Sequence, residues 1–397
     1  MFRNLSLGIS EIGIALVLLG VPIGMYLNYF FGNSTFFSQV VMLISLLFII
    51  NYRNLVTFKF YKVGFTLLYI LIFQIICILY AIYAVDFQFL NMHLYLIFLI
   101  ICLTLVDYKN LSITNTIFYI FLLSSFCSIL GAYFLYKGLL VGREVWDIKQ
   151  YSDNYALEIF TVAYSSLISF TCCLYYLEKK KFYFLSFIMM LLNVYVIIGG
   201  GKRSPFIALF FIYLTWFISS KSINKFKAIF LIAIFLAIMS ILILFNQDYY
   251  NALDKIISST LLGVQAFMGN SNVLDQTGSA SYRVGLREWS YTLINLRFNF
   301  INYFFGYGYM TRWLDNPILQ SFLDMGILGL FFYSTIIIMT PLVFLSKNTS
   351  KEQILFFTLC IYAIITCFSS GNPYLYIKYI PVIIFVYFYY LQKRSNI

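Results

Sequence analysis

Apolar stretches of roughly 17 residues or more recur along almost the whole chain, and they limit its fold more than any other feature. A stretch of that length crosses the hydrocarbon core of a bilayer as one helix. No water is present there to pair with backbone groups, so each stretch must satisfy its own hydrogen bonds as a helix. Only 10% of the residues are charged, against about 25% in soluble domains. The sequence therefore predicts an all-α, polytopic transmembrane bundle.

Twelve spans are expected, and the loops between them orient the chain. Their approximate limits are 9–30, 35–51, 63–84, 88–106, 112–136, 155–176, 182–199, 205–219, 228–245, 317–345, 354–370 and 373–391. Basic residues gather in alternate loops, which is typical of the cytoplasmic side. These residues are Arg53, Lys59, Lys62, Lys109, Lys179, Lys180, Lys181, Lys221, Lys225, Lys227, Lys347, Lys351, Lys393 and Arg394. Both termini are therefore expected in the cytoplasm, and the net charge of +11 reflects membrane orientation rather than nucleic-acid binding.

One long polar segment divides the chain into three expected parts. Residues 1–245 hold spans one to nine, residues 246–316 form a large extracytoplasmic loop, and residues 317–397 hold spans ten to twelve. A chain with one sizeable polar segment on a lipid-soluble body is expected to do its work at that segment.

Within this loop, apolar residues at helical spacing predict an amphipathic helix that packs on the outer ends of the spans. They are Tyr282, Leu286, Trp289, Leu293 and Leu296. A second interfacial helix is expected over 250–268, and the turn-rich residues 269–281 would connect the two.

Four groups of cations lie on the expected outer side, where orientation does not require them. They are Lys137, Arg143 and Lys149; Lys202 and Arg203; the loop arginines Arg283, Arg287, Arg297 and Arg312; and Lys378 within the last span. Each could simply reach lipid headgroups, although a cation as deep as Lys378 usually has a partner or a function. The turn "GGGKRSP" at 199–205 precedes a span expected to start at Pro205, and could either bind an anion or be an ordinary tight turn.

The remaining polar candidates are few. Glu158 near the outer start of span six and Asp324 in the second turn of span ten are possible functional carboxylates, or partners of the loop arginines. His93 could relay protons, but a hydrogen-bonded packing role is favoured because the nearby sequence offers no clear acidic partner. All seven cysteines fall within apolar stretches and no CxxC motif occurs, so neither a disulfide nor a metal site is indicated. No cofactor is expected.

Three segments together resemble the O-antigen polymerase and O-antigen ligase superfamily. They are "GGGKRSPFIALFF" (199–211), "SYRVGLREWSYTL" (281–293) and "FFGYGYMTRWLDNPILQSFLDMGILGLFF" (304–332). The family pattern has an arginine in a turn before a span, an arginine-bearing helix in a large periplasmic loop, and a GxG before a His-Asn pair and an Lxxxxx-GxxG helix. The matching positions are Arg203, Arg283, Gly306, Gly308, Asp315, Asn316, Leu319, Asp324, Gly326 and Gly329. Asp315 replaces the histidine of the ligases, which favours the polymerase branch.

This resemblance implies a GT-C-like glycosyltransferase of the bacterial inner membrane whose active site faces the periplasm. Such an enzyme joins oligosaccharide repeats carried on undecaprenyl diphosphate, without a metal ion. The bilayer and a chain-length regulator membrane protein are its further expected partners.

The residues themselves suit that chemistry, because fixed guanidinium groups can stabilise a departing diphosphate. The residues expected at the diphosphate are Lys202, Arg203, Arg283, Arg287, Lys378 and Arg143. Those expected at the sugar are Asn316, Trp313 and Arg312. Asp315, Asp324 and Glu158 are the candidate catalytic carboxylates, one of which would accept the proton of the attacking hydroxyl.

Alternatives remain open at two levels. Asp315 stands just before Asn316 and Pro317, where an aspartate caps a helix well, so it could be a cap, a base or both. The function could instead be that of a ligase acting on a lipid acceptor, a flippase or other transporter of lipid-linked oligosaccharides, or a membrane scaffold. Sparse charge within the spans and one long outer loop favour an outer-face enzyme over a flippase.

Cysteine labelling tests the predicted topology. Because the native cysteines lie in apolar stretches, background labelling should be low. A cysteine at Ser279 should react with an impermeant maleimide in intact cells, and one at Ser222 only after the membrane is opened. Labelling of both positions from the same side would contradict the twelve-span topology.

Overall fold

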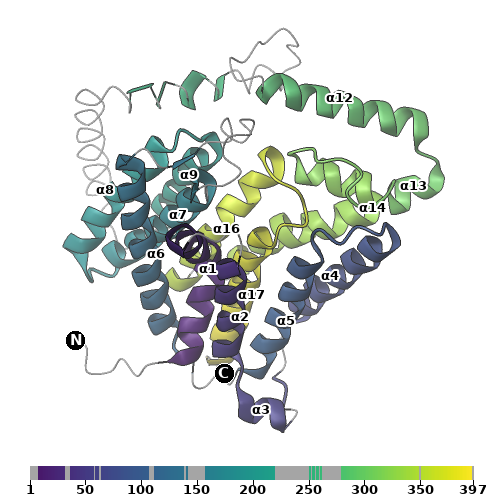
Figure 1. Cartoon of the computed structure of the whole chain (residues 1–397). Helices are drawn as coiled ribbons and strands as arrows, with labels where there is room; N and C mark the ends of the chain where they lie inside the picture. The colour runs from purple at the N-terminus through teal and green to yellow at the C-terminus, as the bar shows by residue number, and fades with distance from the viewer. Residues whose placement is uncertain are drawn as a thin grey trace. The chain divides into compact units, whose positions relative to one another are not determined.

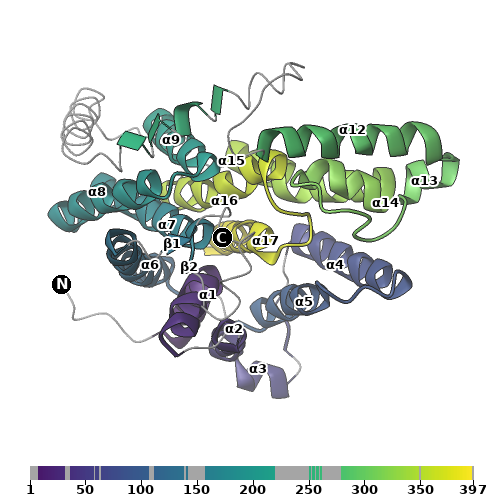
Figure 2. The same cartoon turned by 45° about the horizontal axis from the view of Figure 1, so that its top comes forward.

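The computed structural model describes residues 8–31, 36–57, 59–61, 64–106, 111–137, 140–141, 157–219, 250–251, 253–254, 256–258, 260–261, 279–347 and 350–395. The chain forms two compact units. The first comprises Met1–Phe48 and Ser112–Leu261, and the second Ile49–Leu111 and Leu262–Ile397. Within the described residues both units are built almost wholly of helices (Figures 1 and 2).

The first unit holds six of the described helices and a minimal strand pair. The helices are α1 (Ile9–Phe31), α2 (Phe36–Ile49, whose last residue belongs to the second unit), α6 (Ile113–Tyr136), α7 (Ile159–Glu178), α8 (Tyr183–Gly199) and α9 (Arg203–Ser219). Strands β1 (Leu140–Val141) and β2 (Leu157–Glu158) pair in parallel just before α7. Helix α7 contacts α1, α6, α8 and α9, and for this reason almost all of its side chains are buried.

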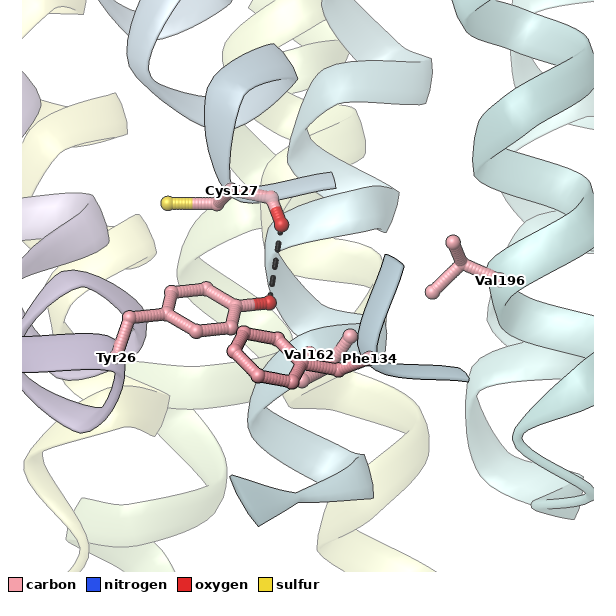
Figure 3. Close-up of a cluster of buried hydrophobic side chains, with 5 residues drawn as sticks. All are labelled: Tyr26, Cys127, Phe134, Val162 and Val196. Atoms are coloured by element: carbon pink, nitrogen blue, oxygen red, sulfur yellow. Dashed lines mark hydrogen bonds between the residues drawn. The ribbon is translucent and has the colours of Figure 1, made fainter. Parts of the chain in front are cut away.

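A cluster of large side chains joins α1, α6, α7 and α8 (Figure 3). The Tyr26 hydroxyl donates to the carbonyl oxygen of Cys127 at 2.9 Å. Its ring stacks on Phe134 with centroids 5.7 Å apart, and Val162 and Val196 complete the cluster. A buried tyrosine is tolerated here because its hydroxyl finds a backbone acceptor.

The second unit holds the helices around the expected outer loop. They are α3 (Tyr52–Val56), α4 (Phe65–Tyr83), α5 (Leu90–Leu105), α12 (Ser279–Arg297), α13 (Phe300–Phe305), α14 (Pro317–Ser334), the π-helical turn η3 (Thr335–Met339), α15 (Thr340–Lys347), α16 (Lys351–Ser369) and α17 (Tyr376–Ser395). Figure 2 shows α12 lying along α14, with α13 at the far end of α12.

Each expected span that the structure describes contains a helix, although residues 157–158 of the sixth span form strand β2 and the helix of the last span, α17, begins at Tyr376. Six helices are long and apolar enough to cross a membrane within the described part of the chain: α1, α4, α6, α7, the stretch Pro317–Ser346 through α14, η3 and α15, and α16. Helices α2, α5, α8 and α9 are apolar but shorter. The expected ninth span, 228–245, lies outside the described residues. The number twelve and the orientation stay predictions, and one boundary is corrected: α9 begins at Arg203 rather than Pro205.

Helix α12 is amphipathic, as its spacing predicts. Leu286 and Leu293 are buried against Leu314 and Leu323, which precede and lie within α14. Leu296 was expected on the same face but is exposed, because the packed stripe continues through Ile294 and Phe298 instead. The side chain of Tyr282 lies outside the description. Of the second expected helix, the described positions between 250 and 261 are helical and the rest is not described.

Helix α14 is broken at Gly326, whose φ of 64° and ψ of −155° are not helical. The break leaves backbone carbonyl groups of α14 without donors from the helix itself. The segment after α13 supplies the missing N–H donors. The N–H of Tyr307 donates to Leu323 at 2.7 Å, and that of Gly308 to Asp324 at 3.3 Å. Irregular backbone within an apolar helix is tolerated when other protein groups satisfy it in this way.

Two glycines make this crossing possible. Gly306 has a φ of 82°, and a Cβ placed on it would overlap the backbone of Asp324 and Met325. A Cβ on Gly326 would overlap the backbone of Phe304 and Phe305 in return. Neither clash can be relieved by moving a flexible side chain, so both positions need glycine.

Alanine at either glycine should therefore unfold this part of the protein. Gly306→Ala and Gly326→Ala combine a positive φ with a backbone clash, and each should cost about 2 kcal/mol or more. Gly285→Ala on α12 is the matched control, since a Cβ there meets nothing within 4 Å. Thermal unfolding in detergent measures the difference; equal melting temperatures for all three variants would contradict the close crossing.

Candidate active site at the start of α14

Asp315 lies at the junction between the polar segment and α14, and its backbone conformation is unusual. Its φ of 54° places it in the left-handed region, which aspartate adopts more readily than most residues. The side chain is 5% exposed. Its Oδ1 accepts hydrogen bonds from the Trp313 indole at 2.8 Å and from the Gly371 N–H at 3.3 Å. Two donors, Trp313 and Gly371, therefore hold the carboxylate although they are far apart in the sequence.

The other oxygen of Asp315 faces an arginine. Arg283 Nε, on α12, lies 3.6 Å from Asp315 Oδ2. The arginine side chain is 30% exposed, whereas the carboxylate is buried. The pair therefore joins the amphipathic helix to the start of α14 and keeps a cation within reach of solvent.

The structure shows which residue caps α14. Asn316 is the N-cap of α14: its Oδ1 accepts from the Leu319 N–H at 3.2 Å, and Pro317 follows in the first turn. The hypothesis that Asp315 caps the helix is wrong, because its left-handed backbone turns its carboxylate toward Trp313, Gly371 and Arg283. Asn316, which was expected at the sugar, uses its side-chain oxygen in this cap.

Asp324 is fully buried and ties three segments together. Its Oδ1 accepts from the Thr311 N–H at 3.0 Å, and its Oδ2 from the Tyr374 hydroxyl at 2.9 Å and Gln320 Nε2 at 3.4 Å. Asp324 thus fastens the loop before α14 and the turn before α17 to α14 itself.

A second hydrogen-bonded group continues beyond Tyr374. The rings of Tyr309 and Tyr374 lie with centroids 4.4 Å apart, and the Tyr309 hydroxyl is 3.0 Å from His93 Nε2. His93 Nδ1 is 2.7 Å from Gln74 Oε1, which can only accept, so Nδ1 carries the proton and Nε2 accepts from Tyr309. His93 is fully buried, which agrees with the packing role favoured from the sequence.

Lys378 is buried at 3% exposure, near the start of α17. Its Nζ donates to the carbonyl oxygens of Thr366 and Ser370, each at 3.0 Å. Both carbonyls stand at the C-terminal end of α16, where the helix dipole is negative. The Thr366 carbonyl also accepts the Ser370 N–H at 3.2 Å, and Ser370 is the C-cap of the helix. The ammonium expected at a diphosphate is therefore engaged by backbone.

The aromatic and basic side chains around the junction have defined contacts. The exposed Arg312 stacks on Trp289 of α12 with its guanidinium carbon 4.8 Å from the ring centroid. Trp313 is half-buried and lies near Phe89. Arg287, one turn after Arg283 on α12, is half-buried. The sequence-predicted residues Arg283, Arg312, Trp313, Asp315, Asn316, Asp324 and Lys378 all belong to the second unit.

Other expected site residues belong to the first unit. Glu158 precedes α7, and its carboxylate accepts from the Thr161 hydroxyl at 2.9 Å. Lys202 lies over the ring of Phe160 at 5.7 Å, and Arg203 is the first residue of α9. Arg143 lies outside the described residues. That Arg203 and Arg283 converge on one cavity therefore stays a prediction.

Sequence reasoning missed several residues that build this site. Thr311, Gln320, Gly371 and Tyr374 all bond to one of the two aspartates. The turn signal "GNPY" at 371–374 could have drawn attention to the segment between the last two spans. The hydrogen bonds from this segment to Asp315 and Asp324, 56 and 50 positions away, had no signal in the sequence.

No set of three or more His, Cys, Asp and Glu side chains gathers to hold a metal ion within the described part of the chain. What the junction offers is a buried carboxylate, a partly exposed guanidinium beside it, and aromatic faces. No family model, curated protein or solved structure matches the chain.

Removing the Asp324 carboxylate should destabilise the protein strongly. Asp324→Ala removes the acceptor of the Thr311 N–H and of the buried Tyr374 hydroxyl, and leaves Gln320 Nε2 with only its bond to Met310 Sδ, which should cost about 3 kcal/mol. Tyr374→Phe removes one bond and should cost about 1 kcal/mol. Thermal unfolding compares both with Glu288→Ala, an exposed position on α12. A melting temperature for Asp324→Ala equal to that of the control would show that the carboxylate does not hold these segments.

Proposed function

We propose that this chain is a membrane glycosyltransferase that polymerises undecaprenyl-diphosphate-linked oligosaccharide repeats into O-antigen or capsular polysaccharide. The observation that carries the proposal is the contact between Arg283 and Asp315. Both residues were selected from the family-like pattern, one in the loop helix and one at the position of the ligase histidine. They are 32 positions apart in sequence (315 − 283), yet their side chains meet.

The chemistry assigns a role to each of the two residues. The acceptor hydroxyl attacks the anomeric carbon of the donor sugar; the new glycosidic bond forms as the bond to the diphosphate oxygen breaks. Undecaprenyl diphosphate departs with negative charge on its oxygens, which the partly exposed guanidinium of Arg283 would stabilise. Asp315 would accept the proton of the attacking hydroxyl.

Asp315 is preferred over the other two carboxylates for this step. Asp324 is fully buried and its oxygens already receive three described donors, so its proposed role is to hold the loop that carries Asp315. Glu158 is exposed but belongs to the first unit, and only Asp315 has a described arginine contact. Trp313, which donates to the Asp315 carboxylate, offers an aromatic face suited to a sugar. Arg312, which stacks on Trp289, is exposed and offers hydrogen-bond donors.

The glycine positions add support. Gly306 and Gly326 belong to the family-like pattern, and the structure gives each a physical requirement at that position. Gly329 is a third such position, since a Cβ there would overlap the carbonyl of Ser321. A chance match would have no reason to place its glycines where side chains cannot fit.

Deletion of the gene and inspection of the surface glycan tests the proposal against its competitors. A polymerase mutant should carry single repeats on the final acceptor. Loss of all glycan from that acceptor would indicate a ligase, and accumulation of cytoplasm-facing lipid-linked units a flippase. The site is proposed at the periplasmic face of the inner membrane, so a flippase result would overturn the proposed function.

Substitutions at the ion pair should slow polymerisation strongly while the protein stays folded. Arg283→Lys keeps the charge but loses the planar fork, and should slow polymerisation about tenfold or more. Asp315→Asn removes the base and should slow it about 100-fold, while α14 keeps its cap at Asn316. Arg297→Lys, on the same helix and exposed, is the control. Rates are measured with purified protein and lipid-linked repeats; parental rates for folded Arg283→Lys and Asp315→Asn would contradict the assigned roles.

A further inference from the structure

One peptide group stands between Lys378 and Asp315. The Lys378 ammonium donates to the carbonyl oxygen of Ser370 at 3.0 Å. The N–H of the next residue, Gly371, donates to Asp315 Oδ1 at 3.3 Å. This C=O and this N–H belong to the same planar amide, whose resonance links them electronically. A cation on the oxygen polarises the amide and makes its N–H a stronger donor.

The surrounding geometry keeps this arrangement in place. Gly371 has a φ of +77°, a conformation in which a side chain is strained, and a Cβ there would approach Leu375 Cδ1 to 2.9 Å. The second Lys378 bond, to Thr366 at 3.0 Å, fixes the ammonium at the end of α16. Because Lys378 is only 3% exposed, its charge acts through the amide rather than by touching a substrate.

We propose that Lys378 is a positioning residue that acts on Asp315 through the Ser370–Gly371 peptide, favouring the ionised carboxylate in its present orientation. The charged groups that the described contacts bring to bear on Asp315 are Arg283 from α12 and Lys378 from α17. Arg283 lies beside Oδ2, whereas the amide that Lys378 polarises donates to Oδ1, so the two cations act at different oxygens of the carboxylate. Any consequence for polymerisation rests on the proposed function, whereas the coupling itself does not.

Trp313 provides a direct probe of this coupling, because its indole N–H donates to the same oxygen that accepts from Gly371. The full-length protein is labelled with 5-fluorotryptophan, and the Trp313 fluorine resonance is assigned by its loss in Trp313→Phe. A pH titration of this resonance, without substrate, gives the midpoint of Asp315 protonation. It is compared in the parent, Lys378→Met, Lys378→Gln, Lys378→Arg and the exposed control Lys393→Met.

Loss of the charge should move the midpoint to higher pH, because the carboxylate is then less favoured in its ionised form. A rise of about one pH unit is expected for Lys378→Met. Lys378→Gln keeps N–H donors for the two carbonyls but carries no charge, so it should shift in the same direction. Lys378→Arg and Lys393→Met should keep the parental midpoint. Thermal unfolding identifies any variant that is not folded.

Two results would overturn the proposal. One is a parental midpoint in folded Lys378→Met or Lys378→Gln. The other is failure of both neutral variants to fold while Lys378→Arg folds, which would make the charge a requirement of the fold alone. If polymerisation is observed, the acid limb of its pH profile should shift with the midpoint. A shifted midpoint in a protein that does not polymerise would reject the proposed function and leave the coupling in place.

Discussion

The fold of the second unit around α14 depends on one constraint: the carbonyl groups at the break in this helix lack donors within the helix. A helix interrupted within an apolar stretch must find hydrogen-bond donors from its own protein. Tyr307 and Gly308 supply them, and this brings the segment after α13 against the middle of α14. Residues 309–316 then lead back to the start of α14. Asp324 holds this loop in place by accepting a hydrogen bond from the Thr311 N–H.

The candidate site forms where this loop reaches the start of α14. The loop ends in a left-handed residue, Asp315, whose side chain cannot serve the helix it precedes and instead meets Arg283 and Gly371. Three segments that are distant in sequence thereby share one carboxylate. The cation beside it is partly exposed and the cation behind it, Lys378, is buried, so the two differ in what they can touch.

Much of the helical framework was predictable because length and hydrophobicity act locally. Each described expected span contains a helix, and the stripe of Leu286 and Leu293 predicts the packed face of α12. The cap of α14 was not predictable, because Asp315 and Asn316 both cap helices well. The choice between them depends on partners on α12 and after α16 that local sequence does not reveal. The partners of Lys378 are backbone carbonyls, which leave no residue-specific signal at all.

The crossing of Gly306 and Gly326 has a consequence for recognising relatives of this chain. Each glycine lies against the backbone of the segment that carries the other, so neither position can gain a side chain while the other stays where it is. Divergent sequences that retain the crossing should therefore keep both glycines, even where the apolar residues around them have drifted beyond alignment. Two glycines twenty positions apart (326 − 306), the second inside an apolar stretch, form a physical signature that can be searched for where overall similarity is lost.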